Sequence, residues 1–133
     1  MGKRSTSRRL AMQVLYQADI GGHSIEEALD NVFAEEEFIE ETKQFAIDLA
    51  KGTWENLAAI DEIIKSSAID WSFERLNIVD RNILRLAIFE LRFAKEKNPL
   101  SVIINEAIEL SKKYSTPESS RFVNGILGKI VKP

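Results

Sequence analysis

Only three prolines occur among the 133 residues, at Pro99, Pro117 and Pro133. Because proline breaks helices more strongly than any other residue, two internal prolines leave long stretches in which helices can form. Apolar residues recur every three to four positions through these stretches, which is the period of an amphipathic helix rather than that of a strand. The sequence therefore predicts an all-α fold of about seven helices.

Local signals indicate where these helices begin and end. Ser24 and Glu27 have the spacing of a capping box, in which each side chain satisfies a free backbone amide of the other residue. The β-branched run at 102–104 leads directly into strong helix formers, so we interpret it as helix. The other expected elements are a first helix capped by Thr6 or Ser7 and stopped by Gly21 and Gly22, a long helix from about Glu36 to Ser66, a turn and short helix after Asp70, a helix from Asn77 to Asn98, and a last helix beginning at Thr116 and Pro117.

The composition argues against most enzyme chemistry. Without cysteine, the chain has no thiolate nucleophile and no cysteine-containing zinc site. The single histidine, His23, follows two glycines and is expected in a surface loop, where it would not serve as the base of a serine triad. We therefore expect a protein that is not an enzyme and that uses no cofactor and no metal.

No apolar run approaches the roughly 20 residues of a membrane-spanning helix, and the basic start is not followed by the apolar core of a signal peptide. We expect a cytoplasmic protein with no membrane partner. The length of 133 residues is typical of one domain.

The formal net charge of −3 at first argues against a nucleic-acid ligand, but the charge is unevenly distributed. Residues 1–9 contain four basic and no acidic residues, and residues 111–133 contain five basic residues and one acidic residue. The segment between them, 10–110, therefore carries −11. The chain is basic at both ends and acidic in the middle.

If the fold brings the two ends together, they form one basic surface on which Tyr114 and Phe122 can stack with unpaired bases, as in single-stranded RNA recognition. The alternative is that the terminal Lys and Arg residues are simply solvated and favour helix ends. Composition alone leaves both interpretations open.

Four segments of the sequence carry a family resemblance: 8–17 (RRLAMQVLYQ), 80–91 (DRNILRLAIFEL), 104–110 (INEAIEL) and 122–127 (FVNGIL). Together they resemble the NusB family of transcription antitermination factors. Each alone is little more than an amphipathic helix, but the four occur in order along nearly the whole chain. The resemblance implies two small helical bundles within a single domain, with subdomains at 1–68 and 69–133, and a role in binding.

The resemblance also implies partners. Members of this family pair with the NusE-type ribosomal protein of the small subunit, and the pair binds boxA RNA in nascent ribosomal RNA transcripts. RNA polymerase that carries this assembly, with other Nus factors, reads through terminators. A homodimer is also possible. Two alternative functions remain: a protein-interaction adaptor without RNA contact, and a detached RNA-binding domain of a ribosomal RNA methyltransferase. The N-terminal part of some of these methyltransferases resembles the same family.

The family's arginine-rich start and a segment near the end are implied to contact RNA, the first by neutralising phosphates and the second by stacking on bases and accepting hydrogen bonds from them. Phe122 could instead pack in the core. The expected RNA-binding residues are Lys3, Arg4, Arg8, Arg9, Lys112, Lys113, Tyr114, Glu118, Arg121 and Phe122, of which Lys112, Lys113 and Arg121 are included for their position and charge alone.

The resemblance places the ribosomal partner on Tyr16, Glu74, Arg75 and Asp80. The alternative is that Asp80 only stabilises the start of its helix and that Tyr16 only packs between the two bundles. Other residues of the four segments are expected to be structural. Arg85, Asn105, Glu106 and Asn124 are expected to satisfy polar groups near helix interfaces, and Gly125 to let two helices approach closely.

Overall fold

The computed structural model describes residues 3–68 and 72–132, with side chains from Arg4 onward. These residues form seven α-helices and two short helical segments, and they contain no strand, so the predicted all-α fold is confirmed. In chain order the elements are α1 (Lys3–Ile20), α2 (Ile25–Phe33), α3 (Glu40–Glu55), α4 (Leu57–Ser67), the 3₁₀ turn η1 (Phe73–Arg75), α5 (Ile78–Ile88), the π-helical turn η2 (Phe89–Phe93), α6 (Leu100–Tyr114) and α7 (Pro117–Val131).

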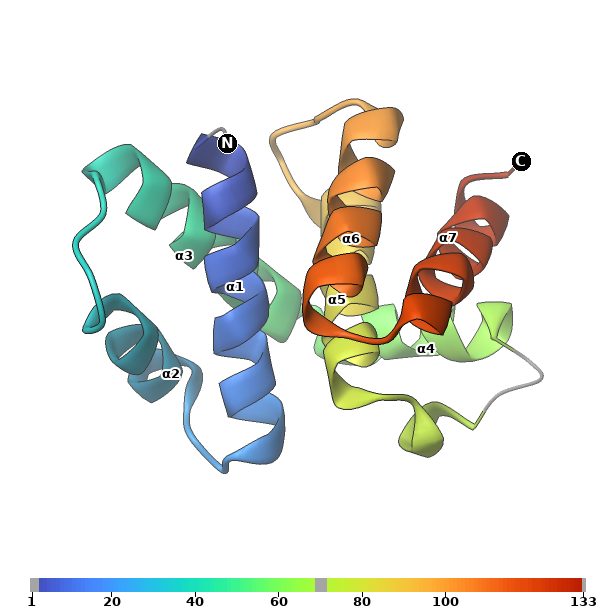
Figure 1. The fold of residues 1–133 in the computed structure, drawn as a ribbon, viewed down its shortest axis with the longest axis horizontal. Coiled ribbons are helices and arrows are strands. Elements are labelled where there is room, and N and C mark those ends of the chain that lie inside the picture. Colours follow the sequence, from blue (N-terminus) through green and yellow to red (C-terminus); the bar gives the residue numbers. More distant parts are fainter. Residues whose placement is uncertain (1–2, 69–71, 133) are drawn as a thin grey trace.

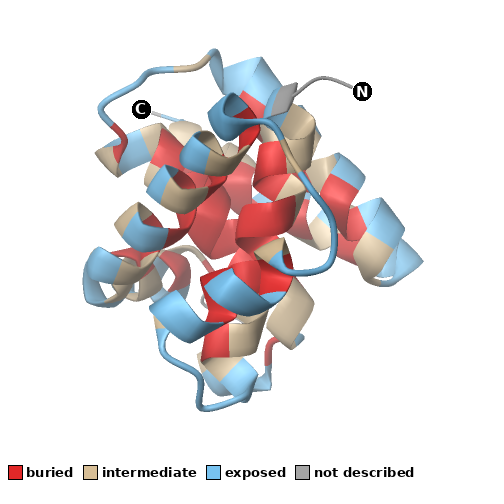
Figure 2. Ribbon diagram, turned by 90° about the vertical axis from the view of Figure 1, so that its left-hand side faces the viewer, coloured by how far each residue is buried: buried red, intermediate tan, exposed pale blue. Residues whose placement is uncertain are grey.

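The helices form two groups that share one core. In Figure 1, α1, α2 and α3 lie on one side of the molecule, and α5, α6 and α7 lie on the other, with α4 passing beneath them. α1 packs against α2 and α3 within its own group and also against α5 and α6 across the boundary. Buried segments gather near the middle of the molecule (Figure 2), and one hydrophobic cluster includes residues of both groups.

α5 lies at the centre of this core. It packs against α1, α3, α4, α6 and α7, and 8 of its 11 residues are buried. Its apolar residues recur over more than one face of the helix, which is typical of a helix that is surrounded on all sides. The segment 80–91 therefore has its regular apolar pattern because it contacts nearly every other element.

The first predicted helix start is wrong, because α1 begins at Lys3 and includes Thr6 and Ser7, which were expected to cap it. Three other predicted starts are confirmed. Ser24 and Glu27 form the expected capping box at the start of α2. The side chain of Asn77 accepts hydrogen bonds from the backbone amides of Val79 at 2.8 Å and Asp80 at 3.4 Å. α7 begins at Pro117 as expected, and residues 102–104 are helical, within α6. The turn expected at Asp70 falls on residues 69–71, outside the described residues.

The long helix predicted from Glu36 to Ser66 is wrong. Helix begins only at Glu40, and it breaks at Asn56, which separates α3 from α4. The side-chain amide of Asn56 donates to the carbonyl oxygen of Gly52 at 2.8 Å, competing with the backbone for that acceptor. The break allows α4 to turn and pack against α5 and α7. The subdomain boundary at 68/69 stays a prediction, and this packing associates α4 with the C-terminal helices.

The helix predicted to reach Asn98 also ends earlier. Its last turn is the π-helical segment η2, and the backbone becomes extended at Ala94. A π-helical turn accommodates one extra residue and changes the direction of the side chains that follow. Here it places Phe89 and Phe93 along the same cleft, beside α3.

A partly buried polar network joins three helices around the buried Arg85, whose predicted structural role is supported. Its guanidinium donates to both oxygens of Asp61 on α4, at 2.8 and 2.9 Å, and to Asp19 at the end of α1 at 3.0 Å. Burial alone would raise the pKa of Asp19, but hydrogen bonds from Arg81 and Asn82 and the charges of Arg85 and Arg81 outweigh it and lower that pKa below its usual value. The network holds the two groups of helices together at one end of α5.

Three other expectations of structural roles are wrong. Asn105 and Asn124 are exposed, so neither satisfies a buried group. A methyl group added at Gly125 would meet no atom within 4 Å, so this glycine does not permit a close approach. In contrast, Glu106 has a partner, because its carboxylate accepts a hydrogen bond from the Ser5 hydroxyl at 2.6 Å.

Candidate nucleic-acid interface

A groove of about 510 Å³ runs between the first turns of α1 and the second half of α6. It is lined by four of the residues expected to bind RNA, together with small hydroxyl side chains and two carboxylates. Those four residues are Arg9 from α1 and Lys112, Lys113 and Tyr114 from α6. The structure therefore brings part of the basic N-terminus beside part of the basic C-terminal segment, which is the condition under which the two ends form one basic surface.

The groove combines positive charge with an aromatic face. Lys112 and Lys113 are exposed, and the Lys113 ammonium lies 5.5 Å from the centre of the half-buried Tyr114 ring. Glu106 and Glu109 also line the groove, and Glu109 lies 3.8 Å from Lys112. Such a surface can bind a phosphate next to a base that stacks on the ring, which is chemistry suited to an unpaired strand.

Arg8 does not line this groove, and its burial contradicts the expectation that it contacts RNA phosphates. Its side chain is 3% exposed and forms a bidentate ion pair with Glu90, at 2.6 and 2.9 Å. Burial alone would lower the pKa of Arg8, but the hydrogen bonds and charge of Glu90 outweigh that effect and raise it. Arg8 therefore joins α1 to η2 inside the protein.

Arg4 lies on the same side of α1 as Arg8, one helical turn earlier, and so faces away from the groove. Its guanidinium lies 3.7 Å from the centre of the Phe45 ring and 2.7 Å from the Glu96 carboxylate. The expected arginine cluster is thus divided between two faces of one helix. The side chain of Lys3 lies outside the described residues.

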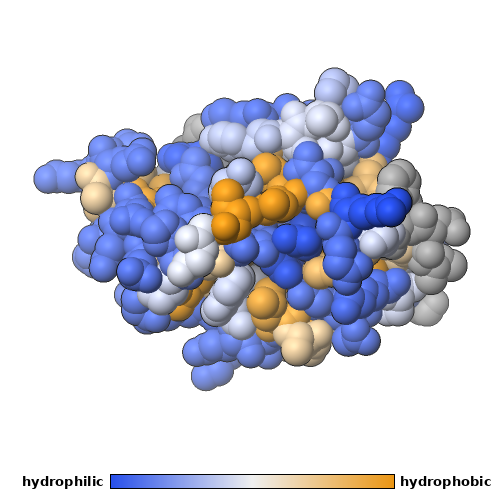
Figure 3. All heavy atoms as spheres, turned by 90° about the horizontal axis from the view of Figure 1, so that it is seen from below, coloured by the Kyte–Doolittle hydropathy of each residue, from blue (hydrophilic) through white to orange (hydrophobic). Residues whose placement is uncertain are grey.

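A second, smaller pocket of about 200 Å³ lies where α5 and α7 begin. Figure 3 views the molecule from this end and shows apolar side chains gathered near the middle of the face among hydrophilic ones. The pocket is lined by Arg75 and Asp80, expected to bind the ribosomal protein, and by Glu118 and Phe122, expected to bind RNA. The fold therefore joins parts of two interfaces that were expected to be separate.

Asp80 is the unusual group in this pocket. It is 6% exposed, and its Oδ2 accepts a hydrogen bond from the Ser119 hydroxyl at 2.7 Å. Its Oδ1 is buried and has no hydrogen-bond partner among the described residues. A buried carboxylate oxygen without a partner is costly, so a bound group that donates a hydrogen bond would be favoured there.

The sequence profile of the NusB family matches residues 5–132. The chain belongs to the NusB family. Transcription antitermination protein NusB of Pelotomaculum thermopropionicum is 47% identical over 131 residues, covering 96% of this chain and 88% of that protein. The NusB protein of Bacillus cereus is 46% identical over 129 residues, which cover 96% of each chain.

Solved structures of this family share the fold. NusB from T. maritima superposes with a TM-score of 0.87 at 39% identity, covering 96% of this chain and 89% of that one. A crystal structure of antitermination factors NusB and NusE in complex with dsRNA gives a TM-score of 0.89 at 32% identity, covering 96% of this chain and 95% of that one. The backbone of this chain therefore closely follows that of the solved NusB structures.

The remaining residues implied by the NusB resemblance lie outside the two cavities. Tyr16 is half-buried and follows Arg9 by two helical turns, so it lies on the same side of α1. Glu74 is exposed, and its carboxylate accepts hydrogen bonds from its own backbone amide and from the Ser72 hydroxyl, which lower its pKa. Arg121 is exposed on α7 and lines neither the groove nor the pocket.

Sequence reasoning missed the neutral groups of this NusB-like surface. Ser5 and Thr6 line the groove, and Ser119 links Asp80 to the turn between α6 and α7. Ser5 precedes Arg9 by four residues, a spacing that places both on one helical face and could have identified it. Nothing local marks Ser119 as the partner of a residue 39 positions earlier.

Two further findings concern the described part of the chain alone. None of its helices is long and apolar enough to cross a membrane. No group of three or more acidic, histidine or cysteine side chains is placed to hold a metal ion within residues 3–68 and 72–132.

Proposed function

We propose that this chain is a transcription antitermination factor that binds boxA-type single-stranded RNA of nascent ribosomal transcripts together with a NusE-type ribosomal protein. With other Nus factors it promotes read-through by RNA polymerase, acting in the cytoplasm by binding rather than by catalysis. Membership of the NusB family and the similarity to a NusB–NusE–RNA complex support this proposal.

The observation that carries RNA binding is the groove between α1 and α6. Arg9, Lys112 and Lys113 line the groove together with Tyr114, and the Lys113 ammonium lies 5.5 Å from the centre of the Tyr114 ring. Cations give affinity for any phosphate backbone, whereas the ring favours bases that are free to stack. The groove therefore favours an unpaired strand.

Binding measured on boxA-like and scrambled RNA strands, with and without the ribosomal protein, tests the proposal. We expect tighter binding to the boxA-like strand, and more so with the ribosomal protein present. Equal affinity for both strands under every condition would contradict sequence-specific binding.

Substitutions in the groove test where the strand lies. Arg9→Ala should weaken binding and reduce the slope of log K against log salt by about 0.7, the value for one phosphate contact on a single strand. Tyr114→Ala should cost about 1–3 kcal/mol of binding, and Tyr114→Phe much less. Lys51→Ala is the matched control, because Lys51 is exposed on α3 and its loss changes the net charge equally. If Arg9→Ala behaves like Lys51→Ala, the adaptor without RNA contact is favoured.

The pocket at Asp80 supports a contact with the ribosomal protein. Its unpartnered Oδ1 can accept a hydrogen bond from a cationic or amide group of that protein. Asp80→Asn keeps the shape of the side chain, and we expect it to weaken the complex with the ribosomal protein about tenfold or more, while affinity for RNA alone stays unchanged. Unchanged affinity for the ribosomal protein would place that contact elsewhere.

A further inference from the structure

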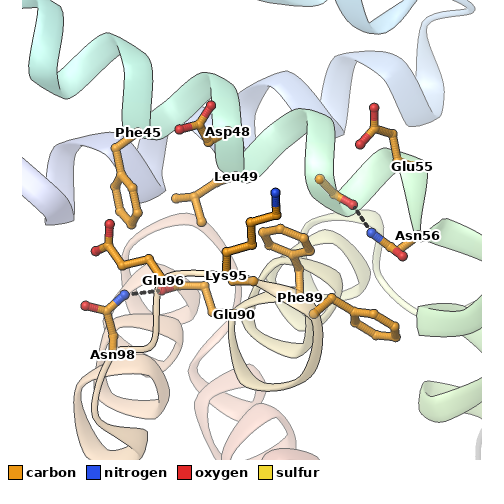
Figure 4. Close-up of a pocket in the computed structure, with 13 residues that line it drawn as sticks. Phe45, Asp48, Leu49, Glu55, Asn56, Phe89, Glu90, Lys95, Glu96 and Asn98 are labelled. Atoms are coloured by element: carbon orange, nitrogen blue, oxygen red, sulfur yellow. Dashed lines mark hydrogen bonds between the residues drawn. The ribbon is translucent and has the colours of Figure 1, made fainter.

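A cleft of about 370 Å³ lies between α3, η2 and the loop that leads to α6, on the side of α1 away from the RNA groove. Figure 4 shows its lining side chains converging from these elements. Its volume is within the roughly 300–1,000 Å³ of typical ligand sites. None of the residues expected to bind RNA or the ribosomal protein lines it.

The floor of the cleft is apolar. Phe45 and Leu49 come from α3, and Phe89 and Phe93 come from η2. All three rings are only half-buried. Gly52 has no side chain, so the Phe89 ring can pack directly on the α3 backbone; a Cβ atom at this position would overlap the ring. The glycine and the π-helical turn together open a space lined by aromatic rings, and π-helical turns occur frequently at functional sites.

The rim of the cleft is acidic. Asp48 and Glu55 are exposed on α3, and neither forms an ion pair with a described residue. Glu41 precedes Asp48 by seven residues, as Asp48 precedes Glu55, so the three acids follow one side of the helix. The only cation among the described lining residues is Lys95. An RNA phosphate would meet these carboxylates unfavourably, whereas a cationic side chain would be attracted.

The chain itself shows how a cation is held at this edge. The guanidinium of Arg4 stacks 3.7 Å from the centre of the Phe45 ring and bonds to Glu96 at 2.7 Å. A ring face and a carboxylate thus hold an arginine from opposite directions. Asp48, Glu55, Phe89 and Phe93 present the same two chemistries along the rest of the cleft.

We propose that this cleft binds a lysine- or arginine-rich segment of a protein partner, with a large apolar side chain seated on the rings of Phe89 and Phe93 and its cations on Asp48 and Glu55. The apolar floor distinguishes this ligand from a simple polycation, and the acidic rim distinguishes it from nucleic acid. The NusB-like chain would then hold RNA on one side of α1 and a basic protein segment on the other.

The test uses the full-length protein and a fluorescent six-residue peptide with tryptophan and leucine between two Lys-Arg pairs, without RNA or ribosomal protein. We expect saturable binding below about 1 mM, with the largest amide shifts in NMR spectra at α3 and η2. Replacing tryptophan and leucine in the peptide by serine should weaken binding at least fivefold, and spermidine should compete poorly. Because the peptide assay contains no RNA and no ribosomal protein, its outcome is independent of the proposed RNA function. The cleft proposal and the RNA proposal can therefore fail separately.

A charge reversal on the protein tests the rim. Asp48→Lys/Glu55→Lys should weaken peptide binding about tenfold or more, because both contacts change from attractive to repulsive. The control Glu36→Lys/Glu37→Lys changes the net charge equally at exposed positions that do not line the cleft. No saturable binding, equal effects of the two double variants, equal competition by spermidine, or shifts centred on the α1–α6 groove would each overturn the proposal.

Discussion

The ion pair between Arg8 and Glu90 allows a quantitative prediction. Their side chains are 3% and 2% exposed, and they share two hydrogen bonds of 2.6 and 2.9 Å. Arg8→Met keeps much of the aliphatic stem but removes both hydrogen bonds to Glu90. Among the described residues, only the Asn98 amide, at 3.3 Å, then still donates a hydrogen bond to the buried Glu90 carboxylate. Removing one partner of such a pair costs about 3–5 kcal/mol, a large share of the about 5–15 kcal/mol that stabilises a typical domain.

The double variant Arg8→Met/Glu90→Met should behave differently. Replacing both charges by apolar groups of similar volume leaves no buried unpaired ion and is often neutral or stabilising. We therefore expect its free energy of unfolding to lie within about 2 kcal/mol of the unmodified protein. Urea unfolding followed by circular dichroism, analysed as a double-mutant cycle, gives the coupling energy directly.

The exposed pair Arg4 and Glu96 is the matched control. Their side chains are 46% and 53% exposed, so the same substitutions there should cost less than about 1 kcal/mol. If Arg8→Met cost as little as Arg4→Met, the assignment of Arg8 to the interior would be refuted. So would a loss of RNA affinity with a lower salt slope in the folded Arg8→Met/Glu90→Met variant, because that result would make Arg8 a phosphate contact.

Three other substitutions test the packing around the sites. Asp19→Asn should destabilise the protein at pH 7, because the folded-state pKa of Asp19 is lowered. The stabilisation is present above the unfolded pKa of about 3.9 and is lost as pH falls through the lower folded value. In unfolding experiments, the difference in stability between the variant and the unmodified protein should therefore shrink below about pH 4. Ser119→Ala removes the hydrogen bond to buried Asp80 and should cost about 1–3 kcal/mol in urea unfolding, whereas no loss would mean that water replaces the hydroxyl. Gly52→Ala should lower the melting temperature despite the better helix propensity of alanine, because its methyl group would displace the Phe89 ring; a higher melting temperature would contradict the close packing.

Local patterns predicted the helices well where the neighbouring sequence decides the conformation. The capping box of Ser24, the cap of Asn77 and the start at Pro117 depend on groups within a few residues, and the structure has all three. Asn56 shows the limit of such signals. Apolar periodicity continues through it, and the helix breaks there as α4 turns to pack against α5 and α7, which are distant in sequence.

The candidate site was predicted in part. Arg9, Lys112, Lys113 and Tyr114 line one groove, as the charge distribution suggested. Arg8 has the same charge as its neighbour but points about 100° away on the helix, toward Glu90. The sequence shows that the two side chains diverge, but the direction in which the groove lies depends on where α6 packs.

The sequence alone determined the all-helical character, the starts of α2, α5 and α7, and the division into basic ends and an acidic middle, because these depend on residue type and on hydrogen bonds between near neighbours. Only the tertiary structure decided that Arg8 is internal, that Asp80 shares a pocket with Phe122, and that an acidic, aromatic cleft lies across α1 from the groove. Charge interactions and burial depend on distance in space, and the packing of helices from opposite ends of the chain sets that distance.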